Sequence, residues 1–431
     1  MVQMEKRIPP DFSTAKGIET WLLSIPKFSD AGVAAANFNL ERMARFCEVL
    51  GNPQLQYKTI HVAGTNGKGT VCRMLASVYQ SAGYRTGLYT SPHLIDLNER
   101  FRLNSESMES SMLPQFFDLA GDHILSFNYT FFELTTAIAF WYFRKMNADV
   151  AVIETGLGGR LDATNVIDPE LSVVTSISLD HTDVLGNTIE LISAEKAGII
   201  KNKKPVITGI LPPEAEEVIK KVAEKNSSPF FTITDSSFDR SDACIETDVQ
   251  SIKNALGKNT TQINYQNALL AAKSLKLLQS SLPLEKEAIA DGFRKLDSRF
   301  PSTAAFERLS QHQRWFFDGA HNPAATEAVI RQMQRLTDLE EWTVILSFMS
   351  DKLNHSLAEK WQAFDQVWLW PMASERAAGE AEMLSYFPNG KILNRTQKEL
   401  LAEIDTKLVI FSGSLYFYSI VREWIHSISA S

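Results

Sequence analysis

The feature that most constrains the fold of this chain is a glycine-rich loop between a strand-like and a helix-like segment. Residues 58–63 (KTIHVA) form a short, largely β-branched and apolar run that ends at a glycine. The loop covers residues 64–70 (GTNGKGT), and apolar residues then recur at spacings of three and four through residues 71–82. A strand, a glycine loop and a helix in this order predict the start of a βαβ unit.

The loop has the chemistry needed to hold phosphate groups. Its glycines let backbone N–H groups converge on an anion, and the N-terminus of the following helix favours negative charge. Lys68 adds a positive charge for the β- and γ-phosphates. The spacing departs from the Walker pattern, because Val62 replaces its first glycine and Gly69 delays the hydroxyl to Thr70. We favour a phosphate site over a plain strand-to-helix turn.

Strand and helix patterns alternate along the rest of the chain. Strands are predicted at residues 149–154, 171–178 and 205–208, and helices at 40–50, 134–146, 189–200 and 265–279. Residues 296–303 are irregular and predict a domain linker. Beyond it, strands are predicted at 315–318, 343–348, 367–370 and 408–411, with helices at 324–336 and 357–363 and a closing helix.

This pattern predicts an α/β protein of two domains. Residues 1–297 would form a P-loop-containing, doubly wound ATP-binding domain with an N-terminal helical segment. Residues 303–431 would form a smaller, Rossmann-like C-terminal α/β domain.

Composition excludes several classes of protein. The chain has 431 residues, of which 44% are apolar and 22% charged, with a net charge of −8. These values suit soluble domains and give no general attraction to nucleic acid or anionic membranes. No apolar run approaches the ~20 residues that span a bilayer, and the first residues do not resemble a signal peptide. The scattered Cys47, Cys72 and Cys244 favour free thiols in a reducing compartment, so we expect a cytoplasmic protein.

Two further polar clusters follow predicted strands. Glu154 ends one apolar strand, and Ser178, Asp180 and His181 follow the next. Ligands of open α/β sheets bind outside the carboxyl ends of strands, so Glu154 is a candidate magnesium ligand. For His181 the residues alone leave three readings open: a general base, a metal ligand or an ordinary loop histidine. Magnesium's preference for oxygen makes histidine the least certain ligand.

Six segments together resemble the folylpolyglutamate synthase and dihydrofolate synthase family, to which the muramyl peptide ligases are more distantly similar. They are residues 61–70 (HVAGTNGKGT), 90–94 (TSPHL), 154–165 (ETGLGGRLDATN), 179–182 (LDHT), 195–199 (EKAGI) and 318–323 (DGAHNP). The resemblance implies an ATP-dependent acid–amino-acid ligase. In this reaction ATP converts a carboxylate into an acyl phosphate, and the amine of L-glutamate attacks it.

The resemblance also implies roles for individual residues. The implied magnesium ligands are Ser91, Glu154 and His181. The implied nucleotide-binding residues are Thr65, Asn66, Gly67, Lys68, Gly69, Thr70, Asn267, Arg299 and Asp318. The implied catalytic residues are Lys68, Lys196, Asp318 and His321. The implied pterin-side residues are Thr130, Phe131, Phe132, Glu133, Leu161, Asp162 and Ala163, with a poorer match at residues 37–39.

Cofactors and partners follow from the same resemblance. The cofactors would be ATP, a pair of Mg²⁺ ions and a carbamate on Lys196. Without the resemblance, Lys196 would be read as a surface lysine paired with Glu195 or solvent. The partners would be dihydropteroate or folate, L-glutamate and ATP, with no nucleic acid or membrane, and the protein would be a monomer.

The predicted function is a bifunctional dihydrofolate synthase and folylpolyglutamate synthase, because the length and the pterin-side positions match bacterial bifunctional members. The alternatives are a folylpolyglutamate synthase alone, another Mur-type amide ligase, or a P-loop NTPase switch. The order Lys68-Gly69-Thr70 argues against a muramyl ligase, and the segment at 318–323 argues against a switch.

Overall fold

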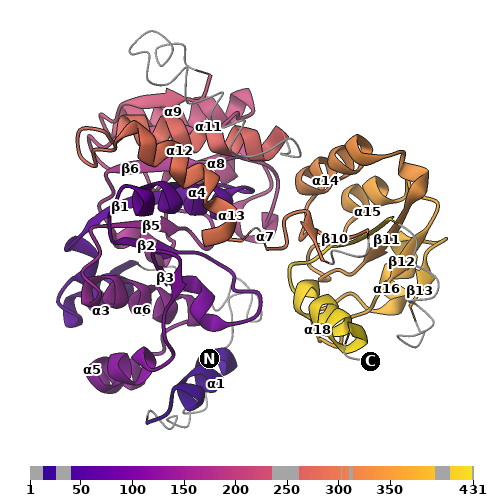
Figure 1. Cartoon of the computed structure of the whole chain (residues 1–431), viewed down its shortest axis with the longest axis horizontal. Helices are drawn as coiled ribbons and strands as arrows, with labels where there is room; N and C mark the ends of the chain where they lie inside the picture. Colours follow the sequence, from indigo (N-terminus) through magenta and orange to yellow (C-terminus); the bar gives the residue numbers. More distant parts are fainter. Residues whose placement is uncertain are drawn as a thin grey trace. The chain divides into compact units, whose positions relative to one another are not determined.

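The protein contains two compact units, Met1–Phe300 and Pro301–Ser431, each with its own sheet (Figure 1). The computed structural model describes residues 13–25, 40–234, 262–301, 303–309, 314–393 and 408–429. The predicted α/β fold class is confirmed in both units. Within the described ranges, every helix is too short or too polar to cross a membrane.

The sheet of the first unit has the strand order β4-β3-β2-β5-β1-β6-β7-β8. The parallel strands are β2 (Thr86–Tyr89), β5 (Val150–Glu154), β1 (Lys58–Ala63), β6 (Leu171–Val174), β7 (Val206–Thr208) and β8 (Phe230–Thr232). At one edge, β3 (Phe101–Leu103) and β4 (Glu106–Ser107) are antiparallel. The carboxyl ends of β2, β5, β1 and β6 therefore lie next to one another.

Helices cover both faces of this sheet, as the predicted doubly wound arrangement requires (Figure 1). One face packs against α4 (Lys68–Ser81), α11 (Gln262–Leu277) and α12 (Lys286–Arg294). The other packs against α1 (Ala15–Ser24), α3 (Leu40–Val49), α5 (Met112–Ser126) and α6 (Phe131–Lys145). Two more helices, α8 (Ile189–Ala197) and α9 (Pro213–Lys225), share a core with β6 and β7.

Successive residues of the central strands face different cores. Val150 and Val152 of β5 belong to the core with α4, whereas Ala151 and Ile153 belong to the core with α6. Side chains alternate across a strand, so a strand with both faces covered must be apolar throughout. This explains why residues 150–153, within the predicted strand 149–154, are all apolar.

The predicted segments of the first unit are confirmed, with shifts at their ends. Strand β6 stops at Val174, before the end of the predicted segment 171–178, because the next residues bond to the phosphate loop. Helices α5, α9 and α12 have no counterpart among the predicted segments. The prediction of an irregular segment at 296–303 is wrong for its first residues, which form the short helix α13 (Leu296–Arg299).

The second unit repeats the layered plan with the strand order β13-β12-β11-β14-β10-β9. The parallel strands are β13 (Lys391–Ile392), β12 (Val367–Leu369), β11 (Trp342–Leu346), β14 (Leu408–Ser412) and β10 (Trp315–Phe317), and β9 (Glu307–Arg308) is antiparallel. Helices α14 (Pro323–Leu336), α15 (His355–Trp361) and α16 (Glu380–Tyr386) contribute to one core. Helix α18 (Phe417–Ser429) contributes Trp424, whose ring stacks on Trp315 with centroids 5.5 Å apart.

Helices α12 and α4 approach each other closely at Gly292. A Cβ atom at this position would lie 2.5 Å from the Cα of Val78, so a larger residue needs backbone movement. The Ser77 hydroxyl donates to the carbonyl of Gly292 at 2.7 Å. The glycine therefore sets how closely α12 covers the helix that begins at the phosphate loop.

We predict that Gly292→Ala lowers the free energy of unfolding of the first unit by about 1–3 kcal/mol, because the added methyl group separates the two helices. Urea denaturation followed by circular dichroism measures this loss. Glu287→Ala on the exposed part of α12 is the control and should change stability by less than about 0.5 kcal/mol. Equal stability of the two variants would contradict the assigned contact.

Candidate active site

The phosphate loop joins β1 to α4 and is tied to the end of β6. The backbone N–H groups of Thr65 and Asn66 donate to the carbonyl and the hydroxyl of Ser176, at 2.8 and 2.9 Å. The Thr175 hydroxyl donates to the carbonyl of Asn66 at 2.6 Å. Gly67 caps α4 with φ of 85°, a conformation that favours glycine. The loop is thus shaped in advance at a helix N-terminus, whose first N–H groups have no intrahelical partner.

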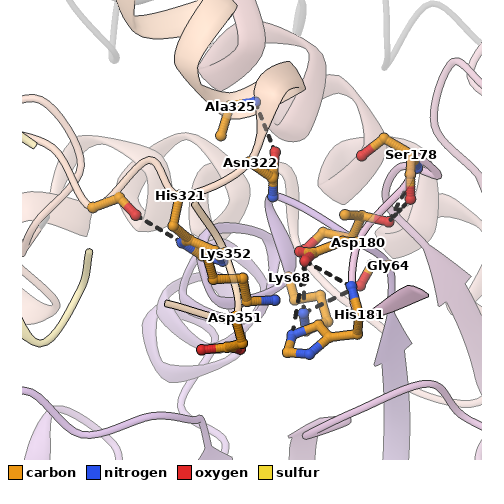
Figure 2. Close-up of polar contacts among 12 residues, drawn as sticks. Gly64, Lys68, Ser178, Asp180, His181, His321, Asn322, Ala325, Asp351 and Lys352 are labelled. Atoms are coloured by element: carbon orange, nitrogen blue, oxygen red, sulfur yellow. Dashed lines mark hydrogen bonds and ion pairs between the residues drawn. The ribbon is translucent and has the colours of Figure 1, made fainter. Parts of the chain in front are cut away.

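Two lysines converge on one carbonyl oxygen of this loop. Lys68 and Lys196 donate from Nζ to the carbonyl of Gly64 at 3.1 and 2.9 Å, and Figure 2 draws the Lys68 bond. Lys196 lies on α8 and is only 4% exposed. The pKa of Lys196 is lowered to about 7, mainly because the side chain is buried and, to a smaller extent, because the positive charge of Lys68 is near. Lys196 is therefore not the surface lysine that its local sequence alone would suggest.

Glu154 places a carboxylate beside the phosphate loop. It ends β5, is 3% exposed, and accepts a hydrogen bond from the backbone N–H of Ser91 at 3.1 Å. A Cβ at Gly69 would lie 3.5 Å from Glu154 Oε2, which shows how near the carboxylate is to the loop. Burial raises the pKa of Glu154, and Lys68 opposes this shift. A buried carboxylate and a serine next to a phosphate loop fit the oxygen donors that Mg²⁺ prefers.

His181 follows β6 at the same edge of the sheet. Its backbone is left-handed, with φ of 49°, at the start of α7 (Thr182–Leu185), and its side chain is 40% exposed. Its Nε2 lies 3.9 Å from Asp180 Oδ1, as Figure 2 shows. In the described part of the chain, no group of three or more His, Cys, Asp or Glu side chains could hold a metal ion.

Two of the predicted nucleotide-binding residues in the first unit lie in different surroundings. Asn267 on α11 is 8% exposed and borders the loop, because a Cβ at Gly67 would lie 2.7 Å from Asn267 Oδ1. Arg299 donates to the Ser77 carbonyl at 2.8 Å and to the Ser81 hydroxyl at 2.6 Å. These contacts are in the later half of α4, so in this structure Arg299 fastens α13 to that helix.

In the second unit, Asp318 and His321 follow strand β10. Asp318 accepts hydrogen bonds from the N–H groups of Phe306 and Ala320 at 2.8 and 2.9 Å. Burial raises the pKa of Asp318 to about 7, although these hydrogen bonds lower it. His321 Nδ1 lies 2.8 Å from the Gly319 carbonyl, and Asn322 caps α14 by accepting from the Ala325 N–H at 2.9 Å (Figure 2).

The predicted pterin-side residues at 130–133 begin helix α6. Thr130 and Glu133 form a capping box, and Glu133 also bonds to Arg42 at 3.1 Å. Phe131 is buried beneath the Arg100 guanidinium, whose carbon lies 5.1 Å from the ring centroid. Phe132 is partly exposed. Within this helix start, the ring of Phe132 is thus the more accessible aromatic group.

The second pterin-side segment, 161–163, belongs to the same loop as Gly156, on which Phe132 rests. A Cβ at Gly156 would lie 2.4 Å from the Phe132 ring, so the ring rests on the backbone of this loop. Asp162 is 5% exposed and accepts from the Leu157 N–H at 2.9 Å, whereas Leu161 and Ala163 are partly exposed. Residues 37–39, and Cys244, lie outside the described residues.

Several residues that shape the site were missed by sequence reasoning. Thr175 and Ser176 support the phosphate loop but were assigned to a longer strand. Arg100 is only 5% exposed and donates from Nε to His93 Nδ1 at 2.7 Å. The β-branched and hydroxyl residues at 175–178 suit a strand, and only the hydrogen bonds to residues over a hundred positions away reveal their part.

Comparisons with known proteins agree with this geometry. The Mur ligase middle domain matches residues 62–275. The dihydrofolate synthase/folylpolyglutamate synthase of Bacillus subtilis is 32% identical over 415 residues, which cover 89% of this chain and 94% of that protein. The Escherichia coli protein of the same name is 34% identical over 401 residues, covering 90% of this chain and 88% of that protein.

A solved structure extends the comparison to three dimensions. The structure described as E. coli FolC in complex with DHPP and ADP has a TM-score of 0.80 and 29% identity, and the match covers 98% of this chain and 100% of that chain. The expected resemblance is thereby confirmed along nearly the whole sequence. This chain belongs to the dihydrofolate synthase/folylpolyglutamate synthase family of ATP-dependent ligases.

Proposed function

We propose that this protein is a bifunctional dihydrofolate synthase and folylpolyglutamate synthase. The observation that carries the proposal is the similarity, over about nine tenths of the chain, to bacterial enzymes that bear both names. The reaction transfers the γ-phosphoryl group of ATP to a carboxylate of dihydropteroate or a folate. The amine of L-glutamate then attacks the acyl phosphate, an amide bond forms and phosphate leaves.

For the nucleotide, we assign the phosphate-binding role to residues 65–70. The N–H groups at the start of α4 and the Lys68 ammonium would neutralise charge on the transferred group. Asn267, which borders Gly67, would contact the nucleotide. ATP contacts from Arg299 and Asp318, and a phosphate-facing role for His321, stay predictions of the family resemblance.

For the metal, we assign Ser91 and Glu154 as ligands, with His181 as a third predicted ligand. Bound Mg²⁺ would neutralise phosphate charge and orient the γ-phosphoryl group. The position of Glu154 against Gly69 supports this assignment, because it sets an anion beside the loop that would bind the phosphates. A pair of ions remains a prediction.

We further propose that Lys196 is carbamylated. A neutral amine is the form that reacts with carbon dioxide, and a pKa of about 7 leaves much of Lys196 neutral at physiological pH. The carbamate would replace a second ammonium next to Lys68 with an anion that supports the metal site. This change would also remove the repulsion between the two lysines at the Gly64 carbonyl.

For the acceptor, we assign the pterin side to Phe132, Leu161, Asp162 and Ala163, next to the backbone of Gly156. Thr130, Phe131 and Glu133 would shape this surface from within helix α6. The partial exposure of the Phe132 ring suits stacking on a flat heterocycle. That the enzyme acts as a monomer in the cytoplasm also stays a prediction.

The activity can be tested directly by phosphate release. Purified protein with ATP and Mg²⁺ is given dihydropteroate and L-glutamate, and in a second reaction tetrahydrofolate and L-glutamate. We expect glutamate-dependent phosphate with both acceptors. Phosphate with one acceptor alone would restrict the protein to a single activity, and its absence with both would refute the proposal. Blanks without glutamate measure any background ATPase activity.

Substitution of Lys196 tests its role in turnover. Lys196→Ala should reduce turnover by about 10- to 100-fold, because it removes a buried group that supports the metal and phosphate site. Lys204→Ala is the matched control, since Lys204 is a partly exposed lysine of the same region that pairs with Glu170 at 3.2 Å. Full activity of Lys196→Ala would defeat the assignment.

The carbamate has its own signature. With ¹³C-labelled bicarbonate, carbon NMR should show a carbamate signal in the natural protein and none in Lys196→Ala. The signal should weaken as the pH falls through about 7, because the amine then takes up a proton. A carbamate signal that persists in Lys196→Ala would assign the modification to another lysine.

A further inference from the structure

A buried chain of hydrogen bonds leads from the phosphate-loop strand to the pterin-side loop. His61 lies in the middle of β1 and is 0% exposed, and its Nε2 is 2.8 Å from the hydroxyl of Thr164. That hydroxyl lies 2.5 Å from Asp162 Oδ1, and the Thr164 N–H donates to the same oxygen at 3.0 Å. The other oxygen, Asp162 Oδ2, accepts from the N–H of Leu157.

The donors around Asp162 set the direction of every bond in this chain. Its carboxylate is surrounded by donors, namely the N–H groups of Gly156, Leu157 and Thr164 and the Thr164 hydroxyl. The Thr164 hydroxyl donates to Asp162 Oδ1, and these donors favour the ionised, accepting form of the carboxylate although burial raises its pKa. The hydroxyl can then only accept from His61, which must carry its proton on Nε2.

The second ring nitrogen of His61 makes the histidine costly for the stability of the fold. His61 Nδ1 is buried and has no hydrogen-bond partner in the described structure. A buried acceptor without a partner destabilises a protein, and an apolar residue in β1 would avoid the penalty. Burial, with a smaller effect of Lys201, also lowers the pKa of His61 to about 3, so the ring stays neutral near pH 7. A neutral ring carries one proton, and the contact with the Thr164 hydroxyl assigns it to Nε2.

The residues at the far end of the chain form the surface assigned to the pterin. Asp162 holds the backbone at Gly156 and Leu157, and the Phe132 ring rests on Gly156. The other end belongs to β1, only three residues before Gly64 of the phosphate loop. The chain thus joins the strand that carries the nucleotide loop to the loop that would carry the acceptor.

We propose that His61 is a positioning residue for the acceptor: through Thr164 it fixes the Asp162 carboxylate and, with it, the loop on which Phe132 rests. This role rests on the proposed function, because it concerns the site assigned to dihydropteroate and folate. His61 touches neither substrate; its effect is transmitted by the Thr164 hydroxyl. Its loss should weaken the use of the acceptor while leaving the use of ATP nearly unchanged.

Two matched pairs of variants test this role. In His61→Gln the side-chain amide can replace the Nε2–H donor, whereas in the equally polar His61→Asn it is too short to reach Thr164. Thr164→Ser keeps the hydroxyl, and Thr164→Val removes it at nearly constant shape. For each, KM for dihydropteroate and KM for ATP are measured from glutamate-dependent phosphate release, and folding is checked by thermal denaturation.

We expect His61→Asn and Thr164→Val to raise KM for dihydropteroate about tenfold, as expected when a carboxylate loses one donor. In these two variants KM for ATP should stay within about twofold of the value for the natural protein. In His61→Gln and Thr164→Ser both KM values should stay close to those of the natural protein. Equal values within each pair, or a parallel rise of both KM values, would overturn the inference. If His61→Asn fails to fold, the comparison of Thr164→Val with Thr164→Ser tests the inference by itself.

A readout without turnover separates this inference from the proposed function. If the natural protein releases no glutamate-dependent phosphate, the proposed function is refuted. The hydrogen-bond chain can still be tested, because ¹⁵N NMR of histidine-labelled protein shows which ring nitrogen of His61 carries the proton. We expect a neutral His61 ring protonated on Nε2 that does not titrate between about pH 5.5 and 8.5. A ring protonated on Nδ1, or an Nε2 signal unchanged in Thr164→Val, would overturn the inference.

Discussion

The nucleotide end of the first unit depends on the carbonyl oxygen of Gly64, which accepts hydrogen bonds from Lys68 and Lys196. Two like charges on one acceptor repel each other, and burial makes a second ammonium still less favourable, as the lowered pKa of Lys196 shows. The fold holds both amines there, because one extends from the helix that follows the loop and the other from α8. The repulsion between the two amines would decrease when a negative charge is added beside them, either as a phosphate group or as a carbamate on Lys196.

The sheet order explains how the other groups gather around the phosphate loop. Strands β2, β5, β1 and β6 are neighbours and run parallel, so the segments after them leave the sheet at the same edge. Ser91, Glu154, the phosphate loop and Thr175 follow these strands in turn. Residues widely separated in the chain therefore become contacts without any long side chain, and short hydrogen bonds between loops hold the site in shape.

Local patterns were sufficient to predict strands β1, β5, β6 and β7 of the first sheet and the loop between β1 and α4, but not β2 or β8, or the helices α5, α9 and α12. The apolar run at residues 150–153 indicates burial and the loop glycines indicate backbone shape, and both are properties of adjacent residues. What could not be predicted depends on distant partners. Thr175 looks like a strand residue until its bond to Asn66 is seen. Lys196 follows Glu195 and so reads as a surface lysine that pairs with it or with solvent, and Arg299 gave no sign of its bonds to α4.

The two-sided covering of β1 has a consequence for how this protein can change during evolution. Ile60 and Val62 enter the core shared with α4, whereas His61 points to the opposite side, towards Thr164. Insertion or deletion of one residue between His61 and Gly64 would exchange the two sides, burying the imidazole among aliphatic side chains and removing it from Thr164. Insertion or deletion of two residues would restore the side but move the imidazole about 6.6 Å along the strand, again away from Thr164. The single contact between His61 and Thr164 therefore fixes the number of residues between His61 and the phosphate loop.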